Sequence, residues 1–187
     1  SPPESTNSTW DGQWQMGASG QIALCLSWDE FFPGWDADGS KVQGLWQIER
    51  PIQGKHGLRA ASDAGFGEIP NWGHQGGSIL GLSKYSKNID AAWLFMQWAC
   101  SKDVMTRCTL DGGFAPMRLS SFEDPRVKAR ERVGNGTTRH LPVVKDIIDY
   151  DMASEPDMPL WAGYSNNEIP VELGKLLTGQ AYDGSAK

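Results

Sequence analysis

The chain has 187 residues, of which 39% are hydrophobic and 21% charged, which is the composition of a soluble globular protein of one or two domains. Its net charge of −6 argues against a nucleic-acid partner, because phosphate binding needs a clustered basic surface. No apolar run approaches the roughly 18 residues of a membrane-spanning helix, and the polar start is not a signal peptide, so in a secreted protein that segment would be removed or lie outside this chain.

The first half of the chain predicts one short helix and three short strands. The helix covers residues 13–19 and ends at Gly20. The strands are short apolar runs between turn signals, at residues 21–26, 44–48 and 78–82. A polar aromatic cluster at residues 27–29 follows the first strand, which is where an open α/β sheet places its ligand loops. Residues 49–70 are a long irregular connection, and such connections are often functional.

The second half predicts a series of helices. The clearest begins after Asn88, a capping residue, and is apolar nearly all round to Cys100, so we expect most of its sides to be buried. The other helices are bounded by caps, prolines or glycines and cover residues 101–108, 125–133, 142–152 and 166–177.

Tryptophan stands out in the composition, because the chain has nine. We expect most of them to fill the core or a lobe interface, where large aromatic side chains contribute much of the packing. The others would line a cleft, where their flat faces stack on a ligand.

The three cysteines are Cys25, Cys100 and Cys108. They form no Cys-x-x-Cys motif and the three histidines do not cluster, so a zinc site is not expected. We expect buried free thiols. A bend that pairs Cys100 with Cys108 is the alternative.

The glycine-rich loop at residues 73–77 is the first candidate for chemistry. It is not a P-loop and no helix is predicted at its end, so both phosphate-binding interpretations fail. Its glycines either let backbone N–H groups approach a ligand closely or make a tight turn. No serine or cysteine has the context of a hydrolase nucleophile, and the histidines fall in predicted loops.

Two interpretations of the acidic and aromatic loops remain open. A glycosidase could use Asp29, Glu30 or Asp111, since such enzymes hold two carboxyl groups about 5–10 Å apart across a sugar. Carbohydrate binding without catalysis is the other, because sugar C–H faces pack on aromatic planes while hydroxyls need polar partners. The loops that mix tryptophan with polar residues and glycine lie at residues 27–30, 71–75 and 160–164.

Four short motifs follow one another in a recognisable order. They are GQIAL at residues 20–24, GGSILGL at 76–82, SKNIDAAWLFMQW at 86–98 and GGFAPMR at 112–118. Their order and spacing, from about residue 16 to residue 180, resemble the extracellular solute-binding proteins of ABC importers. Within these proteins the likeness is to the sugar-binding, maltose-binding-like group.

The resemblance implies an α/β fold of the type II periplasmic binding protein kind, in which two lobes joined by a hinge trap a ligand. This chain would be a C-terminal portion, helix-rich with a few short strands. Residues 1–47 would belong to the C-terminal lobe. Residues 48–100 would return to the N-terminal lobe, and residues 101–187 would complete the C-terminal lobe.

The resemblance also implies a function that is not enzymatic. The protein would be periplasmic or extracellular, or lipid-anchored, and would deliver a mono- or oligosaccharide to ABC permease subunits in the membrane, without a cofactor. A carbohydrate-active hydrolase is the alternative. The expected ligand-binding residues, taken by position with Asp29 as the neighbour of Trp28, are Trp28, Asp29, Trp72, Gly76, Gly77, Arg118, Trp161 and Tyr164.

Overall fold

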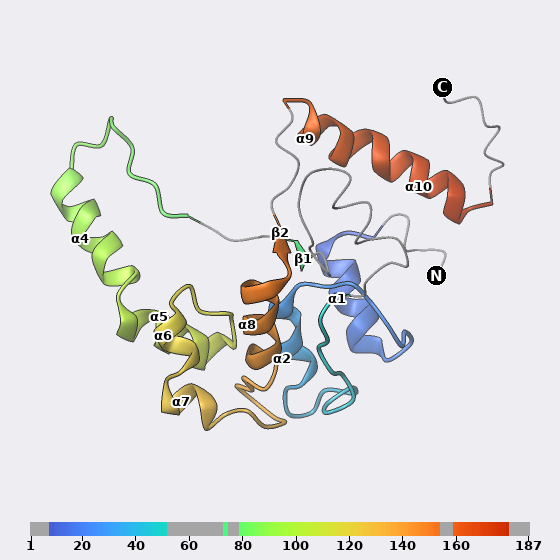
Figure 1. Ribbon diagram of the computed structural model, residues 1–187, viewed down its shortest axis with the longest axis horizontal. Helices are drawn as coiled ribbons and strands as arrows, with labels where there is room; N and C mark the ends of the chain where they lie inside the picture. Colours follow the sequence, from blue (N-terminus) through green and yellow to red (C-terminus); the bar gives the residue numbers. More distant parts are fainter. Residues whose placement is uncertain (1–7, 52–72, 75–78, 154–158, 180–187) are drawn as a thin grey trace.

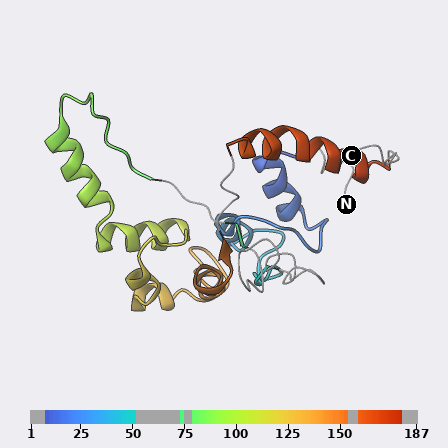
Figure 2. The same ribbon diagram turned by 45° about the horizontal axis from the view of Figure 1, so that its top comes forward.

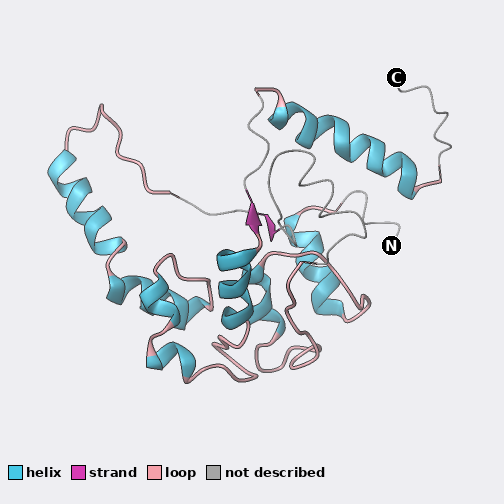
Figure 3. Cartoon of the chain, viewed as in Figure 1, coloured by secondary structure: helices cyan, strands magenta, loops and turns pink. Residues whose placement is uncertain are grey.

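A computed structural model of the protein describes residues 8–51, 73–74, 79–153 and 159–179. This part of the chain is helix-rich, and its strands β1 and β2 are two residues long (Figure 3). In chain order the elements are α1 (Trp10–Ser19), η2 (Asp29–Phe31), α2 (Phe32–Trp35), β1 (Gly73–His74), α4 (Ile89–Ala99), α5 (Lys102–Gly112), α6 (Leu119–Phe122), α7 (Pro125–Lys128), α8 (Leu141–Tyr150), β2 (Met152–Ala153), α9 (Trp161–Gly163), η3 (Tyr164–Glu168) and α10 (Ile169–Leu177).

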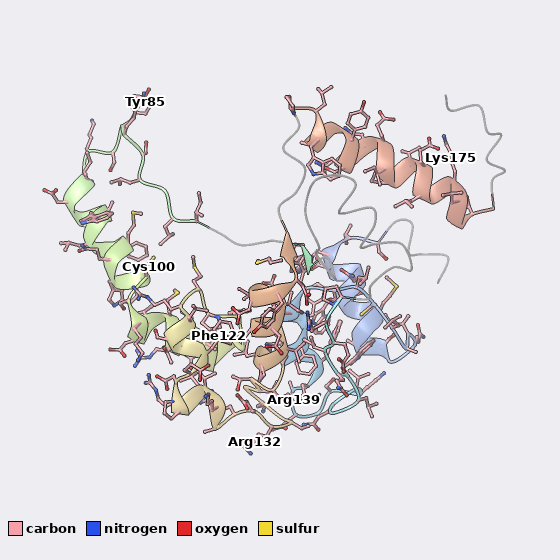
Figure 4. All side chains as sticks on the ribbon, in the orientation of Figure 1. Tyr85, Cys100, Phe122, Arg132, Arg139 and Lys175 are labelled. Carbon is pink, nitrogen blue, oxygen red and sulfur yellow. The ribbon has the colours of Figure 1, made fainter. Side chains whose placement is uncertain are left out.

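The helices form a central body from which two arms extend (Figure 1). The body contains α1, α2 and the group from α5 to α8. Helix α4 forms one arm and α9 to α10 form the other, and they lie on opposite sides in both views (Figures 1 and 2). The labelled side chains of Phe122 and Arg139 lie in the body, whereas Tyr85 and Lys175 lie on the arms (Figure 4). No helix among the described residues is long and apolar enough to cross a membrane.

The first core of the body fixes α1 against α2. It consists of Phe31, Trp35 and Val42, with Ala18, Cys25 and Trp46 packed against them. Two indole N–H groups donate to carbonyls of α1: Trp35 Nε1 to Trp14 O at 3.0 Å and Trp46 Nε1 to Gly17 O at 3.1 Å. A Cβ at Gly17 would lie 2.2 Å from Trp35 Cζ2, so only glycine allows this close packing.

The second core lies among α5, α6, α7 and α8. It consists of Phe122, Val127 and Leu141, with Leu110, Ala115 and Ile148 packed against them. The Asp124 carboxylate accepts the Arg126 N–H at 2.9 Å and so caps α7. The buried hydroxyls of Thr106 and Ser121 satisfy one another at 2.9 Å.

An ion pair between Asp36 and Arg139 joins the two cores. The residues are 103 positions apart, and the guanidinium donates to both carboxylate oxygens at 2.8 and 3.0 Å. Arg139 also donates to Trp46 O at 2.6 Å and lies 4.6 Å from the centre of the Phe32 ring. Burial of Asp36 would raise its pKa, but the hydrogen bonds from Arg139 and from the Gly44 N–H outweigh burial and lower it.

A second polar contact fixes the short parallel strand pair to α8. Gly73 pairs with Met152, and its N–H donates to Asp151 O at 2.8 Å. The fully buried Asp151 carboxylate accepts two hydrogen bonds of 2.6 Å from Arg50. A Cβ at Gly73 would lie 2.8 Å from Ile147 Cγ2, so glycine is required for this approach.

Most of the predicted helices are confirmed. The first begins earlier than expected and ends at Gly20, which has the left-handed φ of 73°. The helix that contains residues 89–99 and helix α8 end close to their predicted limits, whereas the helix predicted over residues 101–108 continues to Gly112. The last helical segment begins at Trp161 rather than after Asn166.

The helix predicted over residues 125–133 is wrong in length, since α7 ends at Lys128. The Arg130 carbonyl accepts the Thr138 N–H at 2.9 Å, and the Arg130 guanidinium donates to Leu110 O. The contacts of Arg130 with Thr138 and Leu110 take the place of the next helical turn.

The prediction of a buried strand over residues 21–26 is wrong. Leu24 and Leu26 are 75% and 82% exposed. The Leu26 carbonyl accepts a hydrogen bond from the Gln13 side chain, and no described strand lies beside the segment. A strand needs a partner for its backbone groups, and an apolar run does not supply one.

The other two strand predictions also fail in the described residues. Residues 44–48 begin in a turn in which the Leu45 N–H donates to Val42 O at 3.0 Å. Residues 79–82 are irregular, with Ile79 91% exposed. Helix richness is therefore confirmed, and the predicted short strands do not form where the sequence suggested.

The expected burial of aromatic and sulfur side chains is largely wrong. Among the tryptophans of the described part, Trp35 is buried and the others are exposed or half-buried. Helix α4 has no buried residue. The three thiols are free, but Cys100 and Cys108 are exposed. Cys25 is half-buried, and burial raises the pKa of its thiol.

Candidate functional site

An open pocket lies where α1 and η2 meet the turn after α5. It has a volume of about 390 Å³. Its lining is aromatic and acidic: Trp10, Asp11, Trp14, Gln15, Glu30, Phe31 and Phe114. We call it the aromatic pocket. No lysine or arginine is among these described lining residues.

Ring contacts hold the wall of the aromatic pocket in place. Trp10 meets Phe31 edge to face, with ring centres 4.7 Å apart at 76°. The ring of Trp28 also contacts Trp10, with ring centres 5.4 Å apart. Phe31 in turn contacts the buried Trp35 at 5.7 Å. The wall is therefore anchored in the first core and preorganised for a ligand.

Helix α1 supplies the second wall. Trp10 and Trp14 are one helical turn apart, as are Asp11 and Gln15, so each pair lies on one face of the helix. A Cβ at Gly34 would lie 3.3 Å from Trp14 Nε1, so Gly34 leaves room for that indole. The helix thus presents aromatic and polar groups side by side.

The turn after α5 closes the third side. Gly113 has the left-handed φ of 71°, and a Cβ there would lie 2.4 Å from Pro33 Cγ. Its carbonyl lies 2.8 Å from His140 Nε2. At Gly112 a Cβ would lie 2.3 Å from the Phe114 ring. The glycine pair therefore lets Phe114 fold back toward the pocket while Pro33 and His140 hold the turn.

Two carboxyl groups of η2 lie beside the pocket. Burial raises the pKa of Asp29, although the N–H groups of Asp29 itself and of Ala115 lower it in part. Burial and then the negative charge of Asp29 raise the pKa of Glu30. Asp29 thus connects η2 to the turn after α5, and Glu30 is the one that lines the pocket.

His140 supports the turn from inside the body. It is 1% exposed and its ring centre lies 5.1 Å from that of Phe32. Burial lowers its pKa to about 4, so the ring is neutral at neutral pH and Nε2–H can donate to Gly113 O. Nδ1 has no hydrogen-bond partner among the described residues. His140 is a positioning residue rather than a base at the pocket.

The structure brings only some of the predicted ligand-binding residues together. Trp28 contacts the lining residue Trp10 and Asp29 precedes the lining residue Glu30, but neither predicted residue lines the aromatic pocket itself. Arg118 is exposed, and its Nε donates to Cys100 O at 2.8 Å at the end of α4. Trp161 and Tyr164 belong to the arm formed by α9 to α10. Trp72, Gly76 and Gly77 lie outside the described residues.

The sequence analysis missed Trp10, Trp14, Phe31 and Phe114. The spacing of Trp10 and Trp14 by one helical turn, with Asp11 and Gln15 beside them, was the available signal. Nothing local indicates that Phe114 reaches η2, since that contact depends on the fold of the turn.

The acidic residues considered for catalysis do not all lie at the aromatic pocket. Asp111 is exposed at the end of α5 and does not line the pocket where Glu30 lies. Within the described ranges, no group of three or more His, Cys, Asp or Glu side chains could hold a metal ion.

Comparison with known proteins identifies the family. Residues 3–135 match the family described as bacterial extracellular solute-binding protein. The chain is also similar to a probable amino-acid ABC transporter periplasmic-binding protein of Sinorhizobium fredii (strain NBRC 101917 / NGR234), with 36% identity over 63 residues. That similarity covers 34% of this chain and 14% of the relative, so the chain matches a small part of the relative's length.

The family match extends over every residue that lines the aromatic pocket. It confirms the resemblance to extracellular solute-binding proteins that the four sequence motifs indicated. The chain belongs to the family of bacterial extracellular solute-binding proteins.

Proposed function

We propose that this protein is the solute-binding component of an ABC importer, and that it holds a sugar in the aromatic pocket for delivery to permease subunits in the membrane. Family membership supports binding and not catalysis as its function. The relative is named as a probable periplasmic-binding protein of an ABC transporter, which supports a role in ABC transport and a periplasmic location. A lipid-anchored or otherwise extracellular location is equally compatible with the family.

The observation that carries the ligand class is the composition of the pocket wall. Trp10 and Trp14 offer flat faces for the C–H surfaces of a sugar ring. Gln15 and Glu30 offer polar partners for hydroxyl groups beside those faces. Small-molecule sites are typically aromatic or apolar clefts that contain a small number of precisely placed polar groups.

An amino acid is the second candidate, because the relative is named as an amino-acid transporter's binding protein. Its α-carboxylate would need a cationic or N–H partner. The described lining of the pocket offers acidic side chains and no lysine or arginine. We therefore favour the sugar.

We propose a two-lobe fold of the type II binding-protein kind around this pocket. Contacts between Asp36 and Arg139, and between Pro33 and Gly113, support residues 1–47 and 101–187 as parts of one C-terminal lobe. Residues 48–100 would belong to the N-terminal lobe, and the outlying position of α4 supports this division (Figure 1).

The predicted ligand residues beyond the pocket remain part of this proposal. Closure of the two lobes would bring Trp72, Gly76 and Gly77 of the N-terminal lobe to the bound sugar. Arg118, Trp161 and Tyr164 would contact it from the C-terminal lobe. A hinge motion of this kind favours the bound state through contacts made only on closure.

The function is tested by titrating the protein with mono- and oligosaccharides and with free amino acids, followed by tryptophan fluorescence and product analysis. Saturable binding of a sugar without turnover is expected. Release of a hydrolysed product would instead support the hydrolase, and binding of amino acids alone would overturn the sugar assignment.

A matched pair of variants locates the site. Trp10→Ala should weaken sugar binding by about tenfold, because it removes one stacking face of the pocket. Trp98→Ala, on α4 and 59% exposed, should leave binding unchanged. Equal effects of the two substitutions would show that the ligand does not lie in the aromatic pocket.

A further inference from the structure

The charge of the aromatic pocket is one-sided. Asp11 and Glu30 line it, and Asp29 lies directly behind its η2 wall. The ion pairs of the described residues involve neither Asp11 nor Glu30. Both residues are exposed, so beside a neutral sugar their carboxylates would be neutralised by no described cation and would keep only their water contacts.

Two arginines of the described residues, Arg139 and Arg118, are committed to other groups. Arg139 donates to Asp36 and Trp46 O inside the body. Arg118 donates to Cys100 O. Neither lines the pocket, so the described structure supplies no cation of its own to the pocket carboxylates.

The aromatic walls add a second, independent preference for positive charge. A cation that lies over the face of a tryptophan or phenylalanine ring is attracted by the negative face of the π-system. Trp10, Trp14, Phe31 and Phe114 surround the same cavity as the two carboxylates. Ring faces and carboxylates together bind an ammonium group better than either does alone.

The raised pKa of Glu30 is in agreement with this preference. Desolvation and the charge of Asp29 make the ionised form of Glu30 less favourable. A bound cation would relieve that cost. The volume of about 390 Å³ is that of a small-molecule site and admits a single sugar ring.

We propose that the solute held in the aromatic pocket carries a protonated amine, so that it is an amino sugar rather than a neutral one. The proposal rests on the proposed function for the sugar ring, and on the charge of the pocket for the amine. The amine would lie beside Glu30 and Asp11, with the ring against the tryptophan faces.

Calorimetric titration with four probes tests the proposal. Glucosamine carries both ring and amine, glucose lacks the amine, N-acetylglucosamine has it neutralised, and putrescine has amines without a ring. Glucosamine should bind about tenfold more tightly than glucose or N-acetylglucosamine. Raising the salt concentration should weaken binding of glucosamine and not of glucose, because the added attraction is electrostatic.

The outcomes separate this proposal from the proposed function. Equal affinity for glucose, N-acetylglucosamine and glucosamine overturns the amine and leaves sugar binding intact. Putrescine binding as tightly as glucosamine supports the amine and overturns the sugar assignment. Binding of none of the four probes by protein shown to be folded by circular dichroism overturns both.

Two substitutions that each remove one carboxylate charge test the role of Glu30: Glu30→Gln is the test, and Glu131→Gln is its matched control. Glu30→Gln keeps the shape of the side chain and removes its charge, so it should reduce the preference for glucosamine over glucose to about threefold or less. Glu131→Gln removes one exposed charge outside the pocket lining and should leave the preference unchanged. Equal loss in both variants would show that the preference comes from the overall charge of the protein, which overturns the placement at Glu30.

Discussion

The region from α1 to Trp46 and the helix α4 are both rich in tryptophan, and they differ in how those side chains are held. In the first region Trp35 is buried, and the indoles of Trp35 and Trp46 donate to carbonyls of α1. In α4, Trp93 and Trp98 are 52% and 59% exposed. Apolar composition alone therefore does not decide burial.

What differs is the presence of contacts from distant parts of the chain. The first region is crossed by the ion pair between Asp36 and Arg139 and by the close approach of Pro33 to Gly113. These contacts bring α2 and the turn after α5 together and so build the aromatic pocket. Helix α4 has helical spacing and a predicted cap residue, Asn88, but no described element covers its apolar surface.

The largest expected effect comes from Trp35→Ala. It removes a buried aromatic side chain and its hydrogen bond to Trp14 O, so the free energy of unfolding should fall by about 3–5 kcal/mol. Urea denaturation measures the loss. Trp98→Ala, on the exposed surface of α4, is the control and should change stability by about 0.5 kcal/mol or less. Similar losses in both variants would contradict the contrast between the two regions.

The next effect tests the ion pair that joins the cores. Arg139→Met leaves the carboxylate of Asp36, which is 1% exposed, without its cation, so stability should fall by about 3 kcal/mol. The double variant Arg139→Met with Asp36→Asn should recover part of the loss, because it removes the uncompensated charge. Lys128→Met, which breaks the exposed pair with Glu123, should leave the urea midpoint almost unchanged. No recovery in the double variant would show that Arg139 stabilises the body only through packing.

Local patterns predicted the helices, because their signals lie within a few residues. The apolar spacing of residues 89–99 and the start after Ser101 are signals of this kind. Strands need partners elsewhere in the chain, so the apolar run at residues 21–26 could not show by itself that no described strand lies beside it.

The candidate site divides in the same way. The loop of residues 27–30 could be predicted as a candidate, since an aromatic and carboxylates adjoin there, but Glu30 and not Trp28 or Asp29 lines the pocket. Phe114 and His140 could not be predicted, because their positions depend on the contacts of Gly113 with Pro33 and with the His140 ring. The predicted loop position of His140 is correct, since it lies in the turn just before α8, but its burial and its contact with Gly113 could not be read from that position.

The pH dependence of stability tests the role of His140 in holding the turn. Burial lowers its pKa from 6.5 to about 4, so between these values the unfolded chain binds a proton that the folded chain does not. The contribution of His140 to the free energy of unfolding is therefore complete above pH 6.5. As the pH falls to about 4, the free energy of unfolding decreases by roughly 3 kcal/mol.

The control for this measurement is the variant His140→Gln. Its side-chain amide can still donate toward Gly113 O but does not titrate in this pH range. Urea midpoints at pH 7.5, 5.5 and 4.5 should fall more steeply in the unchanged protein than in the variant. Because the carboxylates titrate in both proteins, the difference between the two curves isolates His140. Parallel curves would contradict its assignment as a buried neutral group.

The smallest expected effect gives the sharpest test of the contrast between the body and α4. Leu94 in α4 is 64% exposed, so Leu94→Ala should change the free energy of unfolding by no more than about 0.5 kcal/mol. Leu141 in α8 is 2% exposed, and the same substitution there should cost about 2–5 kcal/mol because it opens a cavity in the second core. The two variants delete the same atoms from helices, so their difference measures coverage by neighbouring residues. A loss at Leu94 as large as that at Leu141 would mean that the apolar surface of α4 is covered in solution.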